Sequence, residues 1–471
     1  VGWSMHGVDA PRALGGGRLR SAPRSKSTRH RRGRTVAVRS LGDKDRTSDF
    51  SKKKMSERVS RWVGGEDAEA FADAYTSGLA NLYDERTNAS GAILLCRAEN
   101  KLPSTKALSK RIEKANHSGF DSRLLGYQDY KGTEELRLAV AAYANRHIAR
   151  KGTIIDPGDL MVSAGCGVVL ENILFALCES GDKALVPAPF YGQFRRDLGM
   201  RAGVGVVPVH GALSGGLRVE DLEAAWDERC KVLLLTNPHN PCGFVYGERE
   251  LKQVLEWAAR RDLHVISDEI YACSVYKDGH DVFVSLLDLV SGLPSEWAAN
   301  KCHTVFGFSK DFGASGLRIG CVHSRNAALS SAWNALGYSC AVSSHTQHVF
   351  AQILSDEEFV DGFLASTKED LRRTADLLTS ELAGVGIRWA GDPTAGLFLF
   401  IDLSHLLAEP TFSAEKQLWA KLARDGVVLN TGSSCGCETP GYFRLTFASM
   451  PGGSSCLREA VRRIAAIGRE G

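Results

Sequence analysis

The sequence predicts an α/β protein with a mostly parallel sheet covered by helices on both faces, followed by a smaller α+β domain with an antiparallel sheet. Three observations support this fold class. Short, continuously apolar segments alternate with helical patterns between about residues 160 and 322, which is typical of parallel strands buried on both faces. After about residue 345 a long amphipathic helix and three further strands replace that alternation. The chain has 471 residues, which is enough for two domains.

Four segments follow from this pattern. Residues 1–55 are basic and lack apolar periodicity, so we expect disorder there. Residues 56–104 form an N-terminal arm that we expect to contribute to the small domain. Residues 105–345 form the large domain, and residues 346–471 form the small C-terminal domain.

The arm and the start of the large domain contain two helices and one short strand. Apolar residues recur at steps of three and four between residues 56 and 83, which predicts a helix carrying Phe71, Ala72, Tyr75, Leu79 and Leu82. Residues 93–95 form a short apolar strand. A second helix is expected from about residue 134 to 148.

Seven strands are predicted in the large sheet, at residues 160–164, 184–187, 204–209, 232–236, 264–267, 304–308 and 319–322. Helices separate most of them, at residues 168–178, after Tyr191, and at residues 220–226 and 251–260. The helix at residues 168–178 is almost wholly apolar, so we expect it to be buried. Ligands of such sheets bind where the strands end in loops at their carboxyl edge.

The small domain begins with a long helix whose apolar stripe consists of Leu371, Ala375, Leu378 and Leu382. Three strands follow, at residues 387–390, 396–403 and 443–448. The last helix carries Leu457, Val461, Ile464 and Ile467 on one face.

The overall composition excludes several classes of protein. A net charge of +3 is too small to predict a polyanionic partner for the whole chain. No apolar run approaches the ~20 residues of a transmembrane helix. The 12 cysteines are scattered along the chain, which indicates reduced thiols. Cys435 and Cys437 lack the spacing of a zinc or redox motif, and we predict no metal site.

Residues 1–40 carry ten arginines and lysines against one acid, Asp9. Such a segment is typical of a disordered tail, of a mitochondrial transit peptide, or of a nucleic-acid-binding tail. All three interpretations stay open. We expect a cytoplasmic protein, or a mitochondrial one if this segment is a transit peptide.

The stretch from Val305 to Gly320 contains the strongest chemical signal. It begins as an apolar strand, turns through small residues near Lys310, and reaches Arg318 before a second apolar run. A buried lysine loses proton affinity, and its neutral amine can form a Schiff base with an aldehyde. An arginine fork suits a phosphate. Together they describe a site for pyridoxal 5'-phosphate (PLP), although a surface lysine on a loop explains this stretch equally well by itself.

Two further clusters follow predicted strands. Cys166 and Gly167 stand at the start of the apolar helix, where exposed backbone N–H groups favour a phosphate, or where a tight connection simply needs small residues. Residues 236–243 contain two Asn-Pro pairs, which fix a rigid turn. In that turn Asn240 either holds a ligand oxygen in one place or makes Asx hydrogen bonds.

Two more clusters carry charge. Asp268 ends a buried strand, and a carboxylate there is costly unless a cation meets it. A protonated pyridine nitrogen would be such a cation, and a helix cap is the alternative. Arg444 alternates with apolar neighbours in a late strand, which suits a substrate carboxylate or an internal salt bridge.

Taken together, these clusters resemble the class I aminotransferase family of fold-type-I PLP enzymes, from about residue 92 to the C-terminus. Within that family the chain is most similar to 1-aminocyclopropane-1-carboxylate synthases and their animal synthase-like relatives. The resembling stretches are residues 98–102, 127–130, 237–241, 268–271, 309–318 and 438–444.

The resemblance implies a role for each matching residue. Lys310 would bind the cofactor covalently and then move the substrate's Cα proton. Asp268 would pair with the pyridine nitrogen. Asn240 and Tyr271 would hydrogen-bond the cofactor's phenolic oxygen, and Tyr191 would stack on its ring.

The remaining roles concern the phosphate and the substrate. Arg318 and the backbone amides near Cys166 and Gly167 would hold the phosphate. Arg444 would bind the substrate α-carboxylate. Glu99 stands where the synthases place an acid that faces the substrate.

The resemblance also implies a homodimer, in which Tyr130 reaches the partner subunit's site. Two positions depart from the synthase pattern, because glycines at 167 and 307 replace residues with hydroxyl groups. Each lost hydroxyl contact predicts a cofactor affinity weaker by about 1 kcal/mol.

The implied activity is that of a PLP enzyme acting on α-amino acids. The first expectation is conversion of S-adenosylmethionine to 1-aminocyclopropane-1-carboxylate and methylthioadenosine. An aminotransferase or a β-lyase acting on other amino acids is the close alternative. A PLP-fold regulator that binds nucleic acid is remote, because residues 1–55 show no helix-turn-helix pattern.

Overall fold

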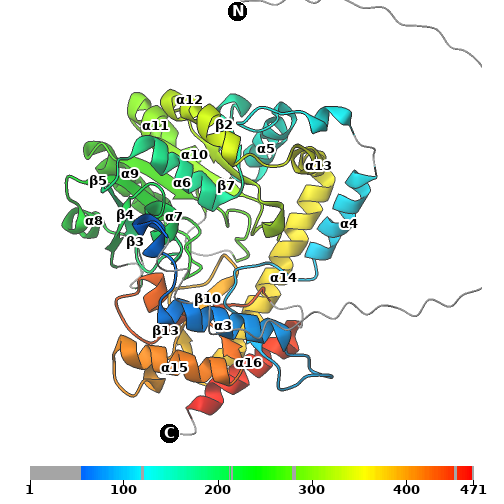
Figure 1. Cartoon of the computed structure of the whole chain (residues 1–471), viewed down its shortest axis with the longest axis vertical. Helices are drawn as coiled ribbons and strands as arrows, with labels where there is room; N and C mark the ends of the chain where they lie inside the picture. The colour runs from blue at the N-terminus through cyan, green and yellow to red at the C-terminus, as the bar shows by residue number, and fades with distance from the viewer. Residues whose placement is uncertain are drawn as a thin grey trace, which may run out of the picture. The chain divides into compact units, whose positions relative to one another are not determined.

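The computed structural model describes residues 55–117, 121–211, 213, 216–277, 283–449 and 453–468. Figure 1 shows the arrangement of its helices and strands. The basic segment at residues 1–40 lies outside the described residues, so its three interpretations stay predictions. Among the described residues, no helix combines the length and apolar composition needed to cross a membrane.

The large sheet has seven strands in the order β2-β8-β7-β6-β5-β3-β4. They are β2 (Leu160–Ser163), β3 (Lys183–Pro187), β4 (Gly205–Val209), β5 (Cys230–Thr236), β6 (His264–Asp268), β7 (Cys302–Gly307) and β8 (Gly320–His323). Strand β8 runs antiparallel to both of its neighbours, and the other pairs are parallel. The predicted mostly parallel, seven-stranded sheet is therefore confirmed.

Helices cover both faces of this sheet. Ile266 of β6 packs in one core, with α6 (Cys166–Leu177), α7 (Phe194–Gly199) and α12 (Ala327–Leu336). Val265, the preceding residue, packs on the opposite face with residues of α8 (Val219–Ala225), α9 (Glu248–Arg260), α10 (Leu286–Leu289) and α11 (Ser295–Lys301). Phe306 of β7 packs with α5 (Glu134–His147) and α13 (Ser344–Leu354). Because both faces are buried, most residues of the central strands are apolar.

A second sheet has its own core. It is antiparallel, in the order β12-β13-β10-β9, with β9 (Arg388–Trp389), β10 (Phe398–Asp402), β12 (Asn430–Thr431) and β13 (Tyr442–Thr446). Helices α14 (Glu357–Gly384), α15 (Phe412–Arg424) and α16 (Gly453–Ile467) supply the rest of that core. The predicted stripe of α14, which consists of Leu371, Ala375, Leu378 and Leu382, is fully buried.

Three local predictions need correction. The helix expected over residues 56–83 is two helices, α2 (Glu57–Ser60) and α3 (Glu66–Ala80). Gly64 and Gly65 between them have φ values of 85° and 112°, which end a helix. The short strand predicted at residues 93–95 is present as β1 (Ile93–Leu94), but its parallel partner β11 (Val427–Val428) was missed, because a two-residue strand shows no periodicity. Helix α6 is not buried all round, since Phe175 is 52% exposed.

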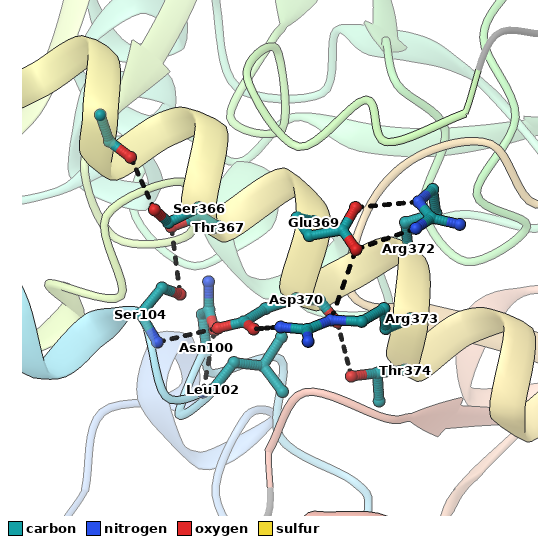
Figure 2. Close-up of polar contacts among 11 residues, drawn as sticks. Asn100, Leu102, Ser104, Ser366, Thr367, Glu369, Asp370, Arg372, Arg373 and Thr374 are labelled. Carbon is teal, nitrogen blue, oxygen red and sulfur yellow. Dashed lines mark hydrogen bonds and ion pairs between the residues drawn. The ribbon is translucent and has the colours of Figure 1, made fainter.

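Helix α14 links the two sheets. It contacts α4 (Thr105–Asn116) and α13 on one side and α16 on the other, as Figure 1 shows. Figure 2 shows how the chain before α4 is fixed to it: the Asp370 carboxylate accepts the Ser104 backbone N–H at 2.8 Å and pairs with Arg373 at 2.7 Å. The segment that leads from residue 98 into α4 is therefore anchored to α14 next to the site described below.

Candidate active site

Lys310 lies in the loop that follows β7, and its Nζ donates a hydrogen bond to the Ala98 carbonyl at 2.6 Å. Burial is the main cause that lowers the pKa of this amine to about 8, and the Arg444 guanidinium adds to the effect. The carboxylates of Glu99 and Asp268 act in the opposite direction. A neutral, nucleophilic amine is therefore accessible near neutral pH.

This pKa predicts how fast the cofactor-free protein forms a Schiff base with PLP. The amine is mostly protonated below its pKa of about 8 and mostly neutral above it. The rate is expected to rise about tenfold per pH unit up to that pKa and then to level off, because only the neutral amine attacks. Visible absorbance after mixing measures it. A rate that keeps rising toward about pH 10.4, as for an ordinary lysine, would contradict the expectation.

Asp268 is the last residue of β6, opposite Val305 of the neighbouring β7. It is 6% exposed, and its Oδ1 accepts the Ile270 backbone N–H at 3.3 Å. Burial raises the pKa of the carboxyl to about 7, although the Ile270 N–H and Lys310 lower it. Within the described part of the chain no cation forms an ion pair with it. A buried carboxylate in this state favours a cationic ligand group.

Arg444 of β13 brings the second sheet into the site. The residue is 5% exposed, and its Nη1 donates to the Asn240 Oδ1 at 3.1 Å. Its Nη2 donates to the Cys96 carbonyl at 3.0 Å and to the Asn430 Oδ1 at 2.9 Å. The buried Nε has no hydrogen-bond partner among the described residues. The Asn240 oxygen is thus occupied, so its NH₂ group is the part that remains to donate to a ligand.

Two tyrosines lie beside these groups. Tyr271 is 2% exposed, and its ring stands edge-on to Phe398, with centroids 5.2 Å apart. Burial raises the pKa of this phenol well above its usual value, so the hydroxyl stays protonated and is able to donate a hydrogen bond. Tyr191 is half-buried, stands edge-on to Phe194 at 5.3 Å, and also has a pKa raised by burial.

Arg318 and the start of α6 meet at one end of the site. Arg318 has a left-handed backbone, with φ 56° and ψ 48°. Its Nη2 donates to the Ala164 carbonyl at 3.0 Å, and its Nη1 donates to the Ser315 carbonyl at 3.0 Å. The N-cap of α6 is Gly165, whose φ is 97° and which offers no side chain to cap the helix. A guanidinium beside a helix N-terminus suits an anion, and Cys166 and Gly167 are the first two residues of that helix.

Three glycines let the backbone close around this point. A Cβ on Gly320 would lie 2.4 Å from the Gly165 carbonyl carbon. A Cβ on Gly307, which pairs with Gly320, would lie 2.8 Å from the Ile319 oxygen and 3.0 Å from the Cys166 Sγ. A side chain at position 307 therefore has no room here unless the backbone shifts. Gly167, the other glycine singled out in the sequence, faces the Asp197 carboxylate, and a Cβ there would lie 3.2 Å from a carboxylate oxygen.

The last two predicted residues lie at the edge of the cluster. Glu99 forms an ion pair with Lys101 at 2.9 Å. Burial acts to raise the pKa of Glu99, but the hydrogen bond from Lys101 brings it below the usual value. Tyr130 packs edge-on against Tyr338 at 5.6 Å, and Tyr338 is 64% exposed. These contacts keep Tyr130 at the surface and do not join it to Lys310.

Sequence reasoning missed three contributors to this site. Asn430 holds Arg444 from the opposite position on β12, and the Ala98 carbonyl holds Lys310. Asp197, beside Gly167, has a pKa raised by burial to about 6. A backbone carbonyl has no sequence signal, and β12 is only two residues long. Asp197 gave a weak signal, because it is an acid within the predicted helix after Tyr191.

The residues present fit PLP. Lys310 supplies an amine for its aldehyde, and the unpaired Asp268 carboxylate suits its pyridine nitrogen. Arg318 and the α6 N-terminus suit its phosphate, because a guanidinium and the first N–H groups of a helix both favour an anion. Among the described residues, no group of three or more histidines, cysteines or acids is placed to hold a metal ion. All 12 cysteines are free thiols.

Comparison with known sequences agrees with this geometry. Residues 90–464 match the family model described as aminotransferase class I and II. Curated relatives include 1-aminocyclopropane-1-carboxylate synthase 1 of Oryza sativa subsp. indica, 35% identical over 79% of this chain and 80% of that protein. Synthase 7 of Arabidopsis thaliana is 33% identical over 89% of this chain and 96% of its own length.

Solved structures share the fold. The aspartate aminotransferase of Thermus thermophilus with maleate has a TM-score of 0.71 and 23% identity, covering 88% of this chain and 99% of that chain. The aromatic aminotransferase of Pyrococcus horikoshii has a TM-score of 0.70 and 22% identity, covering 84% and 98%. At these identities the likeness concerns the fold alone.

Proposed function

The chain belongs to the class I and II aminotransferase family, and on that premise we propose that it converts S-adenosylmethionine to 1-aminocyclopropane-1-carboxylate and methylthioadenosine. It is a PLP-dependent enzyme, as the family and the synthase-like relatives are. The proposal of this substrate is supported by 32–35% identity to curated synthases over most of the chain. The observation that carries the chemistry is the convergence of Lys310, Asp268, Asn240 and Arg444 from two sheets.

The proposed reaction breaks the bond between Cγ and sulfur, forms a bond between Cα and Cγ, and releases the Cα proton. When bound, PLP supplies an electron sink for the carbon that loses this proton. Lys310 would hold the cofactor, and its free amine would accept the Cα proton as a general base. Its lowered pKa of about 8 suits that role near neutral pH.

The other residues bind and orient. We propose that Asp268 keeps the pyridine nitrogen protonated, while the Asn240 amide and the Tyr271 hydroxyl donate to the phenolic oxygen. Tyr191 would cover one face of the ring. Arg444, already held by Asn240 and Asn430, would bind the α-carboxylate as a fixed fork.

Two groups of residues complete the proposed site. Arg318 and the N–H groups of Cys166 and Gly167 would hold the phosphate. Glu99 would face the side chain of the substrate, because its carboxylate is close enough to Lys310 to act electrostatically on the lysine amine.

The test is incubation of the PLP-loaded protein with S-adenosylmethionine labelled in its amino-acid part. Labelled 1-aminocyclopropane-1-carboxylate and an equal amount of methylthioadenosine are expected. Parallel reactions contain other amino acids with a 2-oxo acid. No cyclic product, together with transfer of the amino group to the 2-oxo acid, would assign the protein to the aminotransferases. Pyruvate and ammonia from a β-substituted amino acid would instead identify a β-lyase.

The second candidate class is a PLP-fold regulator that binds nucleic acid through residues 1–55. Nothing in the described residues favours it over an enzyme. If deletion of those residues leaves turnover unchanged and the whole chain shows no salt-sensitive DNA binding, the regulator is eliminated. The same variant, followed in cells, would decide between a cytoplasmic and a mitochondrial protein.

We also propose a homodimer. Leu125 and Tyr127, close to Tyr130 in sequence, are 79% and 86% exposed, and Tyr338 beside Tyr130 is 64% exposed. Such exposed apolar side chains are typical of a covered surface. Sedimentation of the purified protein measures its mass, and a monomer at micromolar concentration would reject the proposal.

A further inference from the structure

Asp311, the residue after the lysine, is a buried carboxylate whose contacts lie outside its own loop. It is 2% exposed, and its side chain is turned away from Lys310 toward the segment that follows β6. Its Oδ2 accepts the backbone N–H of Cys273 at 3.0 Å, and its Oδ1 accepts the Ser274 hydroxyl at 2.5 Å. Among the described residues it forms no ion pair, so these two hydrogen bonds are its principal contacts.

Both donors belong to the turn that carries Tyr271. The Ser274 N–H donates to the Tyr271 carbonyl at 2.9 Å, and the Ala272 N–H donates to the Glu269 carbonyl at 3.0 Å. Cys273 and Ser274 are 2% and 0% exposed, so water does not replace the carboxylate. The position of the Tyr271 phenol therefore depends on a turn that Asp311 holds from outside.

The loop that carries Lys310 is also held by backbone hydrogen bonds. The Gly313 N–H donates to the Lys310 carbonyl at 3.1 Å, and the Ala314 N–H donates to the Phe308 carbonyl at 3.2 Å. Asp311 thus stands between a compact loop that presents an amine and a compact turn that presents a phenol. No hydrogen bond between Lys310 and Tyr271 themselves fixes their separation.

We propose that Asp311 is a positioning residue that sets the Tyr271 hydroxyl relative to the Lys310 amine by binding the turn at residues 273–274. The inference rests on the proposed cofactor site but not on the proposed substrate. Asp311 itself would touch neither cofactor nor substrate and would act only through Tyr271.

The local electrostatics agree with this geometry. Burial raises the pKa of the Asp311 carboxyl to about 7, and the two hydrogen bonds from Ser274 and Cys273 oppose that rise. The more distant cations Lys368 and Arg150 also oppose it, and the buried Tyr143 phenol lies on the α5 side. A carboxylate held in such a costly place by two donors is typical of a positional constraint.

The test uses the PLP-loaded full chain and the pH midpoint of its visible absorbance band. A phenol that donates to the cofactor's phenolic oxygen stabilises negative charge there, so Tyr271→Phe is expected to raise the midpoint. Asp311→Asn is expected to raise it in the same direction, because an amide has one acceptor oxygen and presents N–H to the other donor. It should also lower kcat roughly tenfold with little change in KM.

A double-mutant cycle decides whether Asp311 acts through Tyr271. If it does, Asp311→Asn adds no further midpoint shift to Tyr271→Phe, whereas independent effects would add. An unchanged midpoint in Asp311→Asn, or additive shifts, would overturn the inference. If the unmodified protein forms no visible band at all, the proposed cofactor site itself fails.

Two further variants distinguish a specific effect on the midpoint from a general loss of stability. Ser274→Ala removes one of the two donors and is expected to give a smaller shift in the same direction. Asp288→Asn is the matched control, because Asp288 is a 7% exposed carboxylate that accepts backbone N–H groups of Arg150 and Lys151. It is expected to lower the melting temperature without moving the midpoint. A midpoint shift of equal size in this control would show that the effect is general destabilisation.

Discussion

Replacement of Lys310 by alanine is expected to remove the visible absorbance band of the PLP-loaded protein and to lower kcat at least about 10³-fold. The variant would lose both the proposed covalent link to the cofactor and the proposed base for the Cα proton. Absorbance after gel filtration with PLP measures the first loss, and product formation measures the second. The Lys310 amine donates to the Ala98 carbonyl, and the Arg444 guanidinium helps to lower its pKa, so the substitution also removes these two interactions.

The control for this variant is Lys301→Ala. Lys301 is the last residue of α11, at the opposite end of β7 from Lys310, and pairs with Asp262 at 3.2 Å. It is expected to keep the band and the turnover of the unmodified protein. A Lys310→Ala variant that retains a stable band would assign the Schiff base to a different lysine and end the present assignment.

Replacement of Asp268 by asparagine is expected to lower kcat by roughly 10²–10³-fold while the protein still folds. The amide has nearly the shape of the carboxylate but carries no charge, so the pyridine nitrogen would lose its proton and the ring would be a weaker electron sink. The kcat of the loaded variant and the PLP retained after dialysis are the measurements. Among the described residues no cation forms an ion pair with this buried carboxylate, so the affinity for the cofactor is also expected to fall in the variant.

Glu269→Gln provides a matched control for Asp268→Asn. Glu269 is the next residue, is 0% exposed, and accepts hydrogen bonds from Ser267 at 2.9 Å and from the Leu286 N–H at 2.8 Å. Its loss is expected to lower stability much more than kcat. Equal losses of kcat in the two variants would show that the charge of Asp268 has no special role in catalysis.

Much of the candidate site was predictable because its residues lie at the ends of strands that are recognisable in the sequence. Asn240, Asp268 and Lys310 follow β5, β6 and β7, which are neighbours in the sheet and run parallel. Their side chains must therefore meet at one edge. Arg444 was also predictable, since the residues on either side of it are apolar and face the core of the second sheet.

Other features depended on tertiary contacts that have no local pattern. Asp311 has the sequence appearance of an ordinary loop acid, and only the fold brings the Ser274 hydroxyl to it. Asn430 lies in a strand of two residues, too short for any periodicity. The break between α2 and α3 was recoverable from Gly64 and Gly65, but the apolar recurrence on either side outweighed it.

The glycines at 165, 307 and 320 have a consequence for how this enzyme can change over evolutionary time. Where α6 begins, a Cβ on Gly320 or Gly307 would lie 2.4 Å or 2.8 Å from a main-chain atom, and a Cβ on Gly165 would lie 2.3 Å from the Arg318 Nη2. A side chain at any of these three positions would have to displace the main chain or Arg318, so we expect little variation in the part of the site that we propose for the phosphate. Adaptation to a new amino-acid substrate is expected to proceed instead around Glu99 and Arg444, the residues that we propose for substrate binding.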